Sequence, residues 1–271
     1  MKSNSIFRHS LLIFLSLGWL FPLYLLILNS FADLKRWDAD FDWRYKGWKP
    51  LENLKLGWEA ATLTPGLKSN FFYGILGAGL SVIFASLAAY AIVALNVKRK
   101  ALWFWIIYGA NLIPYQMLLL PLFEVFASTG LYDTRWGLLL VYVGVAIPFA
   151  FFLSRNHMLS IPVEVIEAAR LDGASKFRIY RSIFFPLSRS ALGAAFLFQF
   201  TWIWNDLAFG LTLTTSEEVR PLQSTLSTLL GMYGNTPMPV ILSANFIASL
   251  PTAILFIVAQ RLFVAGLRAG N

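Results

Sequence analysis

The sequence has 271 residues, of which 58% are hydrophobic and 13% are charged, and its mean hydropathy is +0.63. An average soluble domain is about 45–50% apolar and about 25% charged, so this composition argues against a soluble fold and for a membrane protein. There is no cysteine, which excludes disulfides and thiolate metal sites. The formal net charge of +8 would suit a nucleic-acid-binding protein, but the positions of the basic residues explain it otherwise.

Six apolar stretches are long enough to cross a membrane, because a spanning helix needs about 20 apolar residues. We predict spans at about 11–30, 70–95, 101–123, 136–154, 191–213 and 241–264. Pro114 and Pro121 interrupt the third span, which is tolerated where neighbouring helices satisfy the freed backbone groups. The first stretch could be a signal peptide, but it is long for one and no small-residue cleavage site follows, so we expect an uncleaved helix. The sequence therefore predicts an all-α, polytopic membrane helical bundle, with 1–271 forming one transmembrane domain.

Lysine and arginine residues predict the orientation of this bundle. The two short connections on one side contain only Arg135 and Arg220, whereas the connections on the other side are rich in basic residues. The positive-inside rule then places both termini in the cytoplasm. The basic surplus faces anionic lipid and a cytoplasmic partner, so no nucleic acid is expected.

The outer segment 31–69 alternates charged residues with four tryptophans. Two interpretations remain open: an aromatic collar at the membrane interface, or a docking surface for an extracytoplasmic protein. The tryptophans are Trp37, Trp43, Trp48 and Trp58.

The longest interior connection, 155–189, is predicted to hold a short helix. Ser160 is a plausible N-cap and Pro162 suits a first helical turn. We expect a helix from about Ile161 to Leu171, roughly 16 Å long at 1.5 Å per residue. Gly173 follows where a helix C-terminus favours a residue that can adopt positive φ.

One face of this helix is predicted to enter a groove on a partner protein. Small side chains at Ala168 and Ala169 keep the helix slim, and Glu167 is available to a basic group. Spacing of three, four and seven residues places the following side chains on one face: Glu164, Glu167, Ala168 and Leu171. A second helical stretch is expected after Gly173, and Pro186 is expected to bend the chain and act as a hinge.

This segment resembles the EAA loop of ABC importer permeases. The pattern begins with Glu167-Ala168-Ala169 and Gly173, and continues nine residues later with Ile183, Phe185 and Pro186. The family pattern usually has leucine where this chain has Phe185, which is a conservative departure. Several fixed positions over about 20 residues, inside the predicted cytoplasmic loop, make the resemblance specific.

Two further stretches are similar to the carbohydrate branch of this family, in particular to the smaller permease of maltose-type importers. They are Trp202-Ile203-Trp204-Asn205-Asp206 and the ending Gly266-Leu267-Arg268-Ala269-Gly270. The resemblance implies ATP-driven sugar uptake across a bacterial inner membrane. It also implies a second homologous permease, two ATPase subunits that use ATP, and an extracytoplasmic solute-binding protein. No cofactor is then expected on this chain.

The residues themselves contain no constellation for catalysis. The phosphate-binding pattern G-x-x-x-x-G-K-[ST] does not occur, and neither does G-x-S-x-G or H-E-x-x-H. We therefore expect no ATPase site, no catalytic residue and no metal site. The glycines of 74–79 lie inside an apolar stretch, where they are expected to let helices pack closely.

Polar and aromatic residues inside the spans form the predicted substrate pathway. Asp, Asn and Gln can bind sugar hydroxyls, and aromatic rings can cover sugar faces, but interhelical hydrogen bonding explains each polar residue equally well. The residues are Asn111, Gln116, Gln199, Trp202, Asn205, Asp206 and Asn245. Alternatives to a sugar permease are an ABC permease for another solute, an ATPase-independent transporter or channel, and a membrane enzyme.

Overall fold

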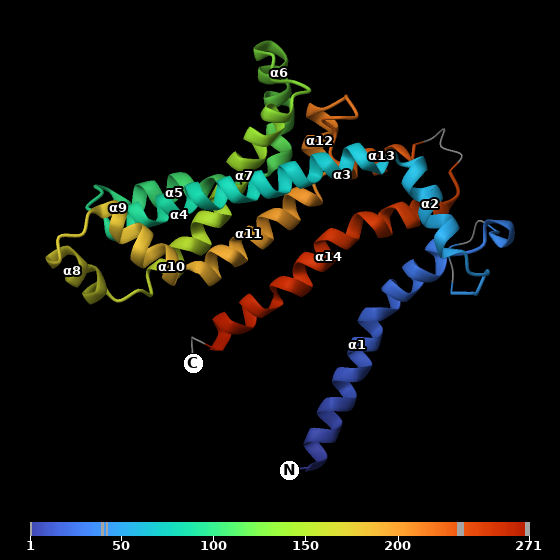
Figure 1. Ribbon diagram of the computed structural model, residues 1–271, viewed down its shortest axis with the longest axis horizontal. Coiled ribbons are helices and arrows are strands. Elements are labelled where there is room, and N and C mark those ends of the chain that lie inside the picture. The colour runs from blue at the N-terminus through green and yellow to red at the C-terminus, as the bar shows by residue number, and fades with distance from the viewer. Residues whose placement is uncertain (1, 39–40, 42, 232–235, 269–271) are drawn as a thin grey trace. The chain divides into compact units, whose positions relative to one another are not determined.

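The computed structural model describes residues 2–38, 41, 43–231 and 236–268, and the regular secondary structure in these ranges is helical throughout (Figure 1). Contacts divide the chain into two units. One unit holds the described residues up to Thr64 together with Thr225–Leu250, and the other holds Pro65–Ser224 and the described residues from Pro251 onward. The prediction of a single permease domain stays a prediction.

In the first unit, α1 (Lys2–Ser30) meets α2 (Pro50–Ala60) and the first part of α14 (Met238–Arg268). Asn53 donates to the carbonyls of Ser30 and Ala32 at 2.8 Å each, and the Ser243 hydroxyl donates to Ser30 O at 2.7 Å. These bonds satisfy carbonyls at the C-terminus of α1, which have no intrahelical partner. Gly57 lets α2 approach α14, because a Cβ there would lie 2.8 Å from Ala244 N.

The tryptophans of the segment 31–69, which is predicted to lie outside, are only partly covered. Trp43 is 71% exposed, while Trp48 packs edge-to-face on Phe31 with ring centroids 5.2 Å apart. The Lys46 ammonium lies 4.4 Å from the centroid of the Trp37 ring. Both interpretations of this segment, interfacial collar and docking surface, remain open.

The second unit is built on α4 (Ala78–Ala94), α7 (Arg135–Met158) and α11 (Arg189–Trp204), which pack against one another (Figure 1). Before α4 come α3 (Leu63–Phe72) and a π-helical turn at Tyr73–Gly77. A Cβ on Gly74 would lie 2.7 Å from the Phe200 ring, and one on Gly77 would lie 2.9 Å from Ile203 Cδ1. The prediction that glycines here serve packing is confirmed at these two positions, and Gly79 has open space around it.

Shorter elements connect these helices. In chain order they are α5 (Lys100–Gly109), 3-10 turns at Ala110–Leu112 and Tyr115–Leu118, α6 (Leu119–Thr129), α8 (Val163–Leu171), α9 (Lys176–Ile179), a π-helical turn at Tyr180–Phe184, α10 (Phe185–Leu187), α12 (Ala208–Leu213) and α13 (Leu222–Thr228). Between α6 and α7, Asp133 fastens the segment that follows α12. Its carboxylate accepts hydrogen bonds from the amides and hydroxyls of Thr215 and Ser216. Partial burial alone would raise the pKa of Asp133, but these bonds outweigh it and lower the pKa below its usual range.

Four helices in the described ranges are long and apolar enough to cross a membrane: Phe7–Ser30, Leu63–Ala94, Arg135–Met158 and Met238–Ala259. Two bent pairs raise the count to six if each pair is one span, which is the predicted number. They are Lys100–Leu112 with Tyr115–Thr129, bent by 89°, and Lys176–Leu187 with Arg189–Trp204, bent by 75°. The break predicted at Pro114 is confirmed, because the residue before a proline is driven out of the helical region.

The helices at two of the predicted spans differ from the bounds predicted for those spans. The helix predicted to begin at residue 70 starts at Leu63. The fifth span, predicted as continuous over 191–213, breaks after Trp204 and resumes as α12 at Ala208. The break arises because the Asp206 carboxylate accepts the amide N–H groups of Phe209 and Gly210 and thereby caps α12.

Candidate functional site

Helix α8 has the position expected of the docking helix, but with nine residues it is shorter than predicted, because it begins later. It starts at Val163 after Pro162, whose ψ of 137° is extended. Ile161 precedes a proline, which disfavours the helical conformation there, so a start at Ile161 was wrong. Ser160 is not the N-cap, because its hydroxyl donates to His157 O at 2.7 Å within the preceding turn.

The two faces of α8 have different surroundings. Ile166 is buried in a core cluster that also contains residues of α4, α7 and α11, and Ala169 packs against this cluster. Of the two small residues in the pattern, only Ala168 is fully open. The predicted docking residues that lie exposed are Glu164, Glu167, Ala168, Leu171 and Gly173. Leu171 is 89% exposed, so α8 presents an apolar side chain that its own chain does not cover.

Hydrogen bonds fasten this segment to α4. The Arg170 guanidinium donates to Ala94 O at 2.7 Å, at the end of α4. The Tyr90 hydroxyl donates to Lys176 O at 2.7 Å, and the Ser86 and Tyr180 hydroxyls lie 2.6 Å apart. Helix α8 and the segment that follows it are therefore attached to α4 by both packed and hydrogen-bonded contacts.

Gly173 ends α8 as predicted. Its φ is +74°, and it donates its amide to Arg170 O while Ala174 donates to Ala169 O, both at 3.0 Å. A Cβ at this position would meet no atom within 4 Å. Glycine is therefore needed for the left-handed backbone and not for space.

Pro186 lies beside the bend between α10 and α11. It occupies α10, directly after the π-helical turn at Tyr180–Phe184, and the chain bends by 75° across Ser188. Proline has no amide N–H to continue the helical ladder, which accounts for an irregular backbone here. The predicted bend is confirmed, and the hinge role stays a prediction.

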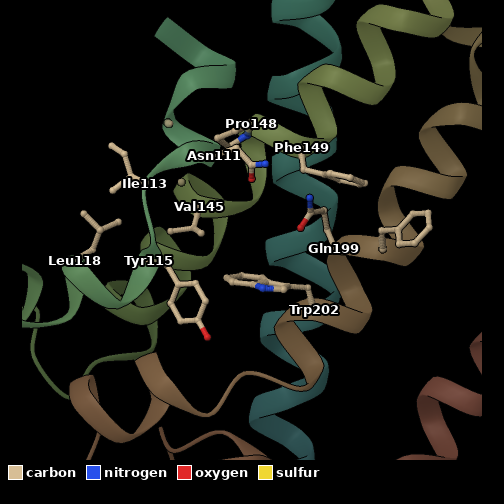
Figure 2. A pocket seen from close by; sticks show the side chains of 12 residues that line it. Asn111, Ile113, Tyr115, Leu118, Val145, Pro148, Phe149, Gln199 and Trp202 are labelled. Atoms are coloured by element: carbon tan, nitrogen blue, oxygen red, sulfur yellow. The ribbon is translucent and has the colours of Figure 1, made fainter. Parts of the chain in front are cut away.

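A cavity of about 460 Å³ lies between α7, α11 and the broken helix α5–α6. Figure 2 shows Gln199 and Trp202 projecting into it from α11, with Asn111 and Tyr115 on the opposite wall. Gln199 donates to Ala146 O at 3.0 Å, which fixes its side chain across the cavity wall. The remaining lining is mostly apolar, with the side chains of Ile113, Leu118, Val145, Pro148, Phe149 and Phe198.

A second, more open cavity of about 750 Å³ adjoins Trp202 and includes Asn205 and Asp206. Asp206 is buried, and its carboxylate accepts a hydrogen bond from the Tyr142 hydroxyl at 2.9 Å in addition to the two amides of α12. Asn205 donates to Thr201 O at 2.8 Å. Both predicted pathway residues thus also hold the backbone around the break.

The structure does not gather all the predicted pathway residues. Gln116 is exposed and lines neither cavity. Asn245 belongs to the other unit and donates to Ile241 O at 2.9 Å within α14. Three aromatic residues that the sequence reasoning missed line the cavities, namely Tyr115, Phe149 and Phe198. Phe198 could have been identified from the sequence, because it lies four residues before Trp202 and therefore on the same face of the helix.

Comparison with known proteins places these features in a family. The sequence profile of a family described as "Binding-protein-dependent transport system inner membrane component" matches residues 81–269. AglG of Rhizobium meliloti (strain 1021), an alpha-glucoside transport system permease protein, is 34% identical over 198 residues, covering 71% of this chain and 52% of that protein. AraQ of Bacillus subtilis (strain 168), an arabinooligosaccharides transport system permease protein, is 28% identical over 274 residues, covering 98% and 96%. This chain therefore spans about half of the first relative and nearly all of the second.

Solved structures share the fold. A chain of a bacterial ABC transporter involved in the import of the acidic polysaccharide alginate superposes with a TM-score of 0.77 at 23% identity, covering 96% of this chain and 98% of that chain. A chain of the MetNI methionine ABC transporter gives 0.58 at 19% identity, covering 79% and 96%. The C-terminal stretch 266–270, which resembles sugar permeases, includes Ala269 and Gly270, and these two lie outside the residues that the structure describes. The family profile covers more than half of the sequence, so this chain belongs to the binding-protein-dependent transport system inner membrane components.

Proposed function

We propose that this chain is the permease subunit of an ATP-driven importer, without an ATPase site of its own, and that its solute is a sugar, glycoside or related polyol. The observation that carries the proposal is α8. Its pattern of Glu167, Ala168 and Gly173 resembles the family's coupling loop, its open face carries Leu171, and its other face is packed on the core. An exposed helix so firmly attached suits a part that receives force from a partner.

Docked ATPase subunits hold α8 in a groove, with Ala168 allowing close approach and Glu167 meeting a basic group. Closure of the ATPases on ATP moves α8, and the contacts of Arg170 and Tyr90 carry this movement to α4. The bend near Pro186 lets the membrane helices swing as nearly rigid pieces between two accesses. ATP shifts this equilibrium only because the docked contacts differ between the two states.

The solute passes beside the cavity lined by Asn111, Gln199 and Trp202. Amide groups matched to hydroxyls, together with flat aromatic rings, are the chemistry that a sugar requires, and predominantly apolar walls with a few polar groups are usual for small-molecule sites. The printed names of AglG and AraQ, which refer to alpha-glucosides and arabinooligosaccharides, support this class. A non-sugar solute is the alternative, because GgtD of Synechocystis sp. is named for osmoprotective compounds.

The complete importer contains a second homologous permease, two ATPase subunits and an extracytoplasmic solute-binding protein. It lies in a bacterial inner membrane with both termini of this chain in the cytoplasm. Support for this orientation comes from the basic residues of the segment 155–189. A topology reporter fused after Lys55 is expected outside, and one fused after Lys176 inside; the same side for both would overturn the six-span topology.

ATPase activity of the purified complex, measured with its binding protein against a panel of sugars, polyols and amino acids, tests the proposal. Stimulation by one sugar or polyol supports it. Stimulation only by a solute of another class replaces the sugar by that solute. Uptake by the purified chain alone, with no ATPase recovered alongside it, favours an ATPase-independent transporter.

A further inference from the structure

A small cavity outside the proposed pathway is lined by basic and apolar residues. It has a volume of about 290 Å³, and its walls are Ile92, Val93, Lys100, Ala101, Phe104, Arg155 and Leu159. These residues come from the end of α4, the start of α5 and the end of α7. None of the lining residues is acidic, so the cavity carries two positive charges and no compensating carboxylate.

Arg155 is held in place with an unused donor. Its guanidinium carbon lies 4.5 Å from the centroid of the Phe104 ring, and its Nη1 donates weakly to the neighbouring Asn156 side chain at 3.4 Å. Its Nε is buried and has no hydrogen-bond partner. A guanidinium beside a cavity with no acidic lining residue favours an anionic ligand in that cavity.

The first turn of α5 adds to the same preference. The helix begins at Lys100, and its first amide N–H groups have no intrahelical acceptor. The Lys100 ammonium donates to Val93 O at 3.2 Å, which keeps it at the cavity wall. The ammonium and the guanidinium therefore line one cavity beside the positive end of the α5 helix dipole.

The position of the cavity indicates which anion it meets. Two apolar helices end here, at Ala94 and Met158, and a third begins at Lys100, so this is the level at which the hydrocarbon of a bilayer gives way to headgroups. Trp103 and Trp105, which are 49% and 58% exposed, follow Lys100 on α5. Tryptophan at this level is typical of the membrane interface.

We propose that this cavity binds the phosphate of an anionic phospholipid, with Arg155 and Lys100 as its two cationic ligands. The phosphate accepts hydrogen bonds from the Arg155 guanidinium and the Lys100 ammonium, while the acyl chains lie along the exposed apolar face of α5. Basic pockets between spanning helices on the cytoplasmic side commonly bind such headgroups. The assignment uses the proposed orientation only to place this end of the helices in the cytoplasmic leaflet.

Native mass spectrometry of the full-length chain, purified with the subunits that accompany it, tests the site by counting retained lipids. The complexes are exchanged from detergent with phosphatidylglycerol or with phosphatidylcholine. Arg155→Gln and Lys100→Gln are each expected to weaken phosphatidylglycerol retention roughly fivefold, as removal of one basic residue at an anionic surface would. Arg189→Gln, which removes an equal charge from an exposed residue outside the cavity, is the matched control.

Four outcomes decide the matter. Selective loss of phosphatidylglycerol in both cavity variants supports the site, and Arg155→Lys, which keeps the charge without the planar donors, is expected to fall between wild type and Arg155→Gln. Equal retention in the cavity variants and the control overturns it, provided that their thermal unfolding in phosphatidylcholine is unchanged. If Arg155→Gln unfolds, Lys100→Gln alone decides.

Displacement of the lipid by inorganic phosphate as readily as by phosphatidylglycerol overturns the lipid as ligand and assigns the cavity to free phosphate. Lipid counting needs no transport, so failure here leaves the proposed function standing.

Discussion

Helix α8 and the cavity beside α11 differ in the number of chain segments that form them. The proposed docking surface is a single helix of nine residues whose pattern is contiguous in sequence. The cavity draws its walls from α7, α11 and the two short turns between α5 and α6. A local surface can be recognised from spacing alone, whereas a cavity depends on how distant segments pack. Residues on α8 that face outward can be changed without disturbing the fold, but several cavity residues also hold the fold together.

The sharpest test of this difference is Ala168→Trp. Ala168 is exposed, so the substitution should leave folding and membrane levels intact. A bulky ring on the docking face should exclude α8 from its groove and abolish both ATPase association and uptake. Pull-down of the ATPase from detergent extracts measures the first effect, and uptake by whole cells measures the second.

Two matched variants accompany it. Ala168→Ser keeps the side chain small and should retain association. Ala169→Trp introduces the same ring one residue later, where Ala169 packs against the core, and should lower the amount of folded protein. Full ATPase recovery and uptake with Ala168→Trp would mean that α8 is not the docking helix.

The second test distinguishes a residue that lines the cavity from a residue that stabilises the fold around it. Trp202→Ala removes a ring from the cavity wall and should reduce sugar uptake about tenfold, the order of effect expected from one lost aromatic contact. Asp206→Leu leaves the Tyr142 hydroxyl and two amides without their acceptor, which should destabilise the fold by about 1–3 kcal/mol. Uptake assays normalised to membrane level, with thermal unfolding in detergent, distinguish the two.

Asp206→Asn preserves an acceptor oxygen and provides the control. Its unfolding temperature should lie between those of wild type and Asp206→Leu. Wild-type stability for Asp206→Leu, combined with lost uptake, would reassign Asp206 from support of the break to a direct role in the pathway.

Much of the fold follows from the sequence because a bilayer imposes a simple length rule. The breaks were harder. The break at Pro114 can be predicted from the proline itself. The break after Trp204, in contrast, arises from hydrogen bonds that Asp206 forms with Tyr142 and the start of α12. An apolar window cannot contain that information, because it depends on a tyrosine of another helix.

The site shows the same division. Gly173 was predictable because a helix end needs a left-handed residue, and its φ of +74° confirms it. Gln116, which was also predicted to belong to the pathway, lies exposed in the 3-10 turn after Pro114 and lines neither cavity. Tyr115, its neighbour, takes the place on the cavity wall.

A smaller effect is expected at Gly173. Gly173→Val forces a β-branched side chain into positive φ, whereas Gly173→Ala is strained less and Gly173→Asn less still. The cost for alanine is about 1–2 kcal/mol, which should fray the end of α8 and weaken ATPase binding without abolishing it. ATPase affinity should fall in the order Gly, Asn, Ala, Val. Because the site has open space around it, equal affinity for all four would show that the exit angle of α8 does not matter.

The smallest effect is expected at Asp133, far from α8 in the sequence. The hydrogen bonds that its carboxylate forms with the segment after α12 should weaken in acid. The hydrogen bonds from Thr215 and Ser216 stabilise the ionised carboxylate and hold its pKa below the usual range. A lowered pKa means that the stabilisation is complete above the ordinary aspartate pKa of about 3.9 and is lost as pH falls through the lowered value. Amide exchange at Thr215 and Ser216 should therefore be protected at neutral pH and lose protection only in strong acid.

Asp133→Asn should reduce that protection at neutral pH and remove its dependence on acid, whereas Glu217→Gln, on an exposed carboxylate in the same segment, should change neither. Because Asp133 lines neither of the two cavities beside α11, uptake at neutral pH should stay close to wild type in both variants. Unchanged protection in Asp133→Asn would show that the segment after α12 is held by other contacts, such as the bond from the Arg135 guanidinium to Glu218 O at 3.0 Å.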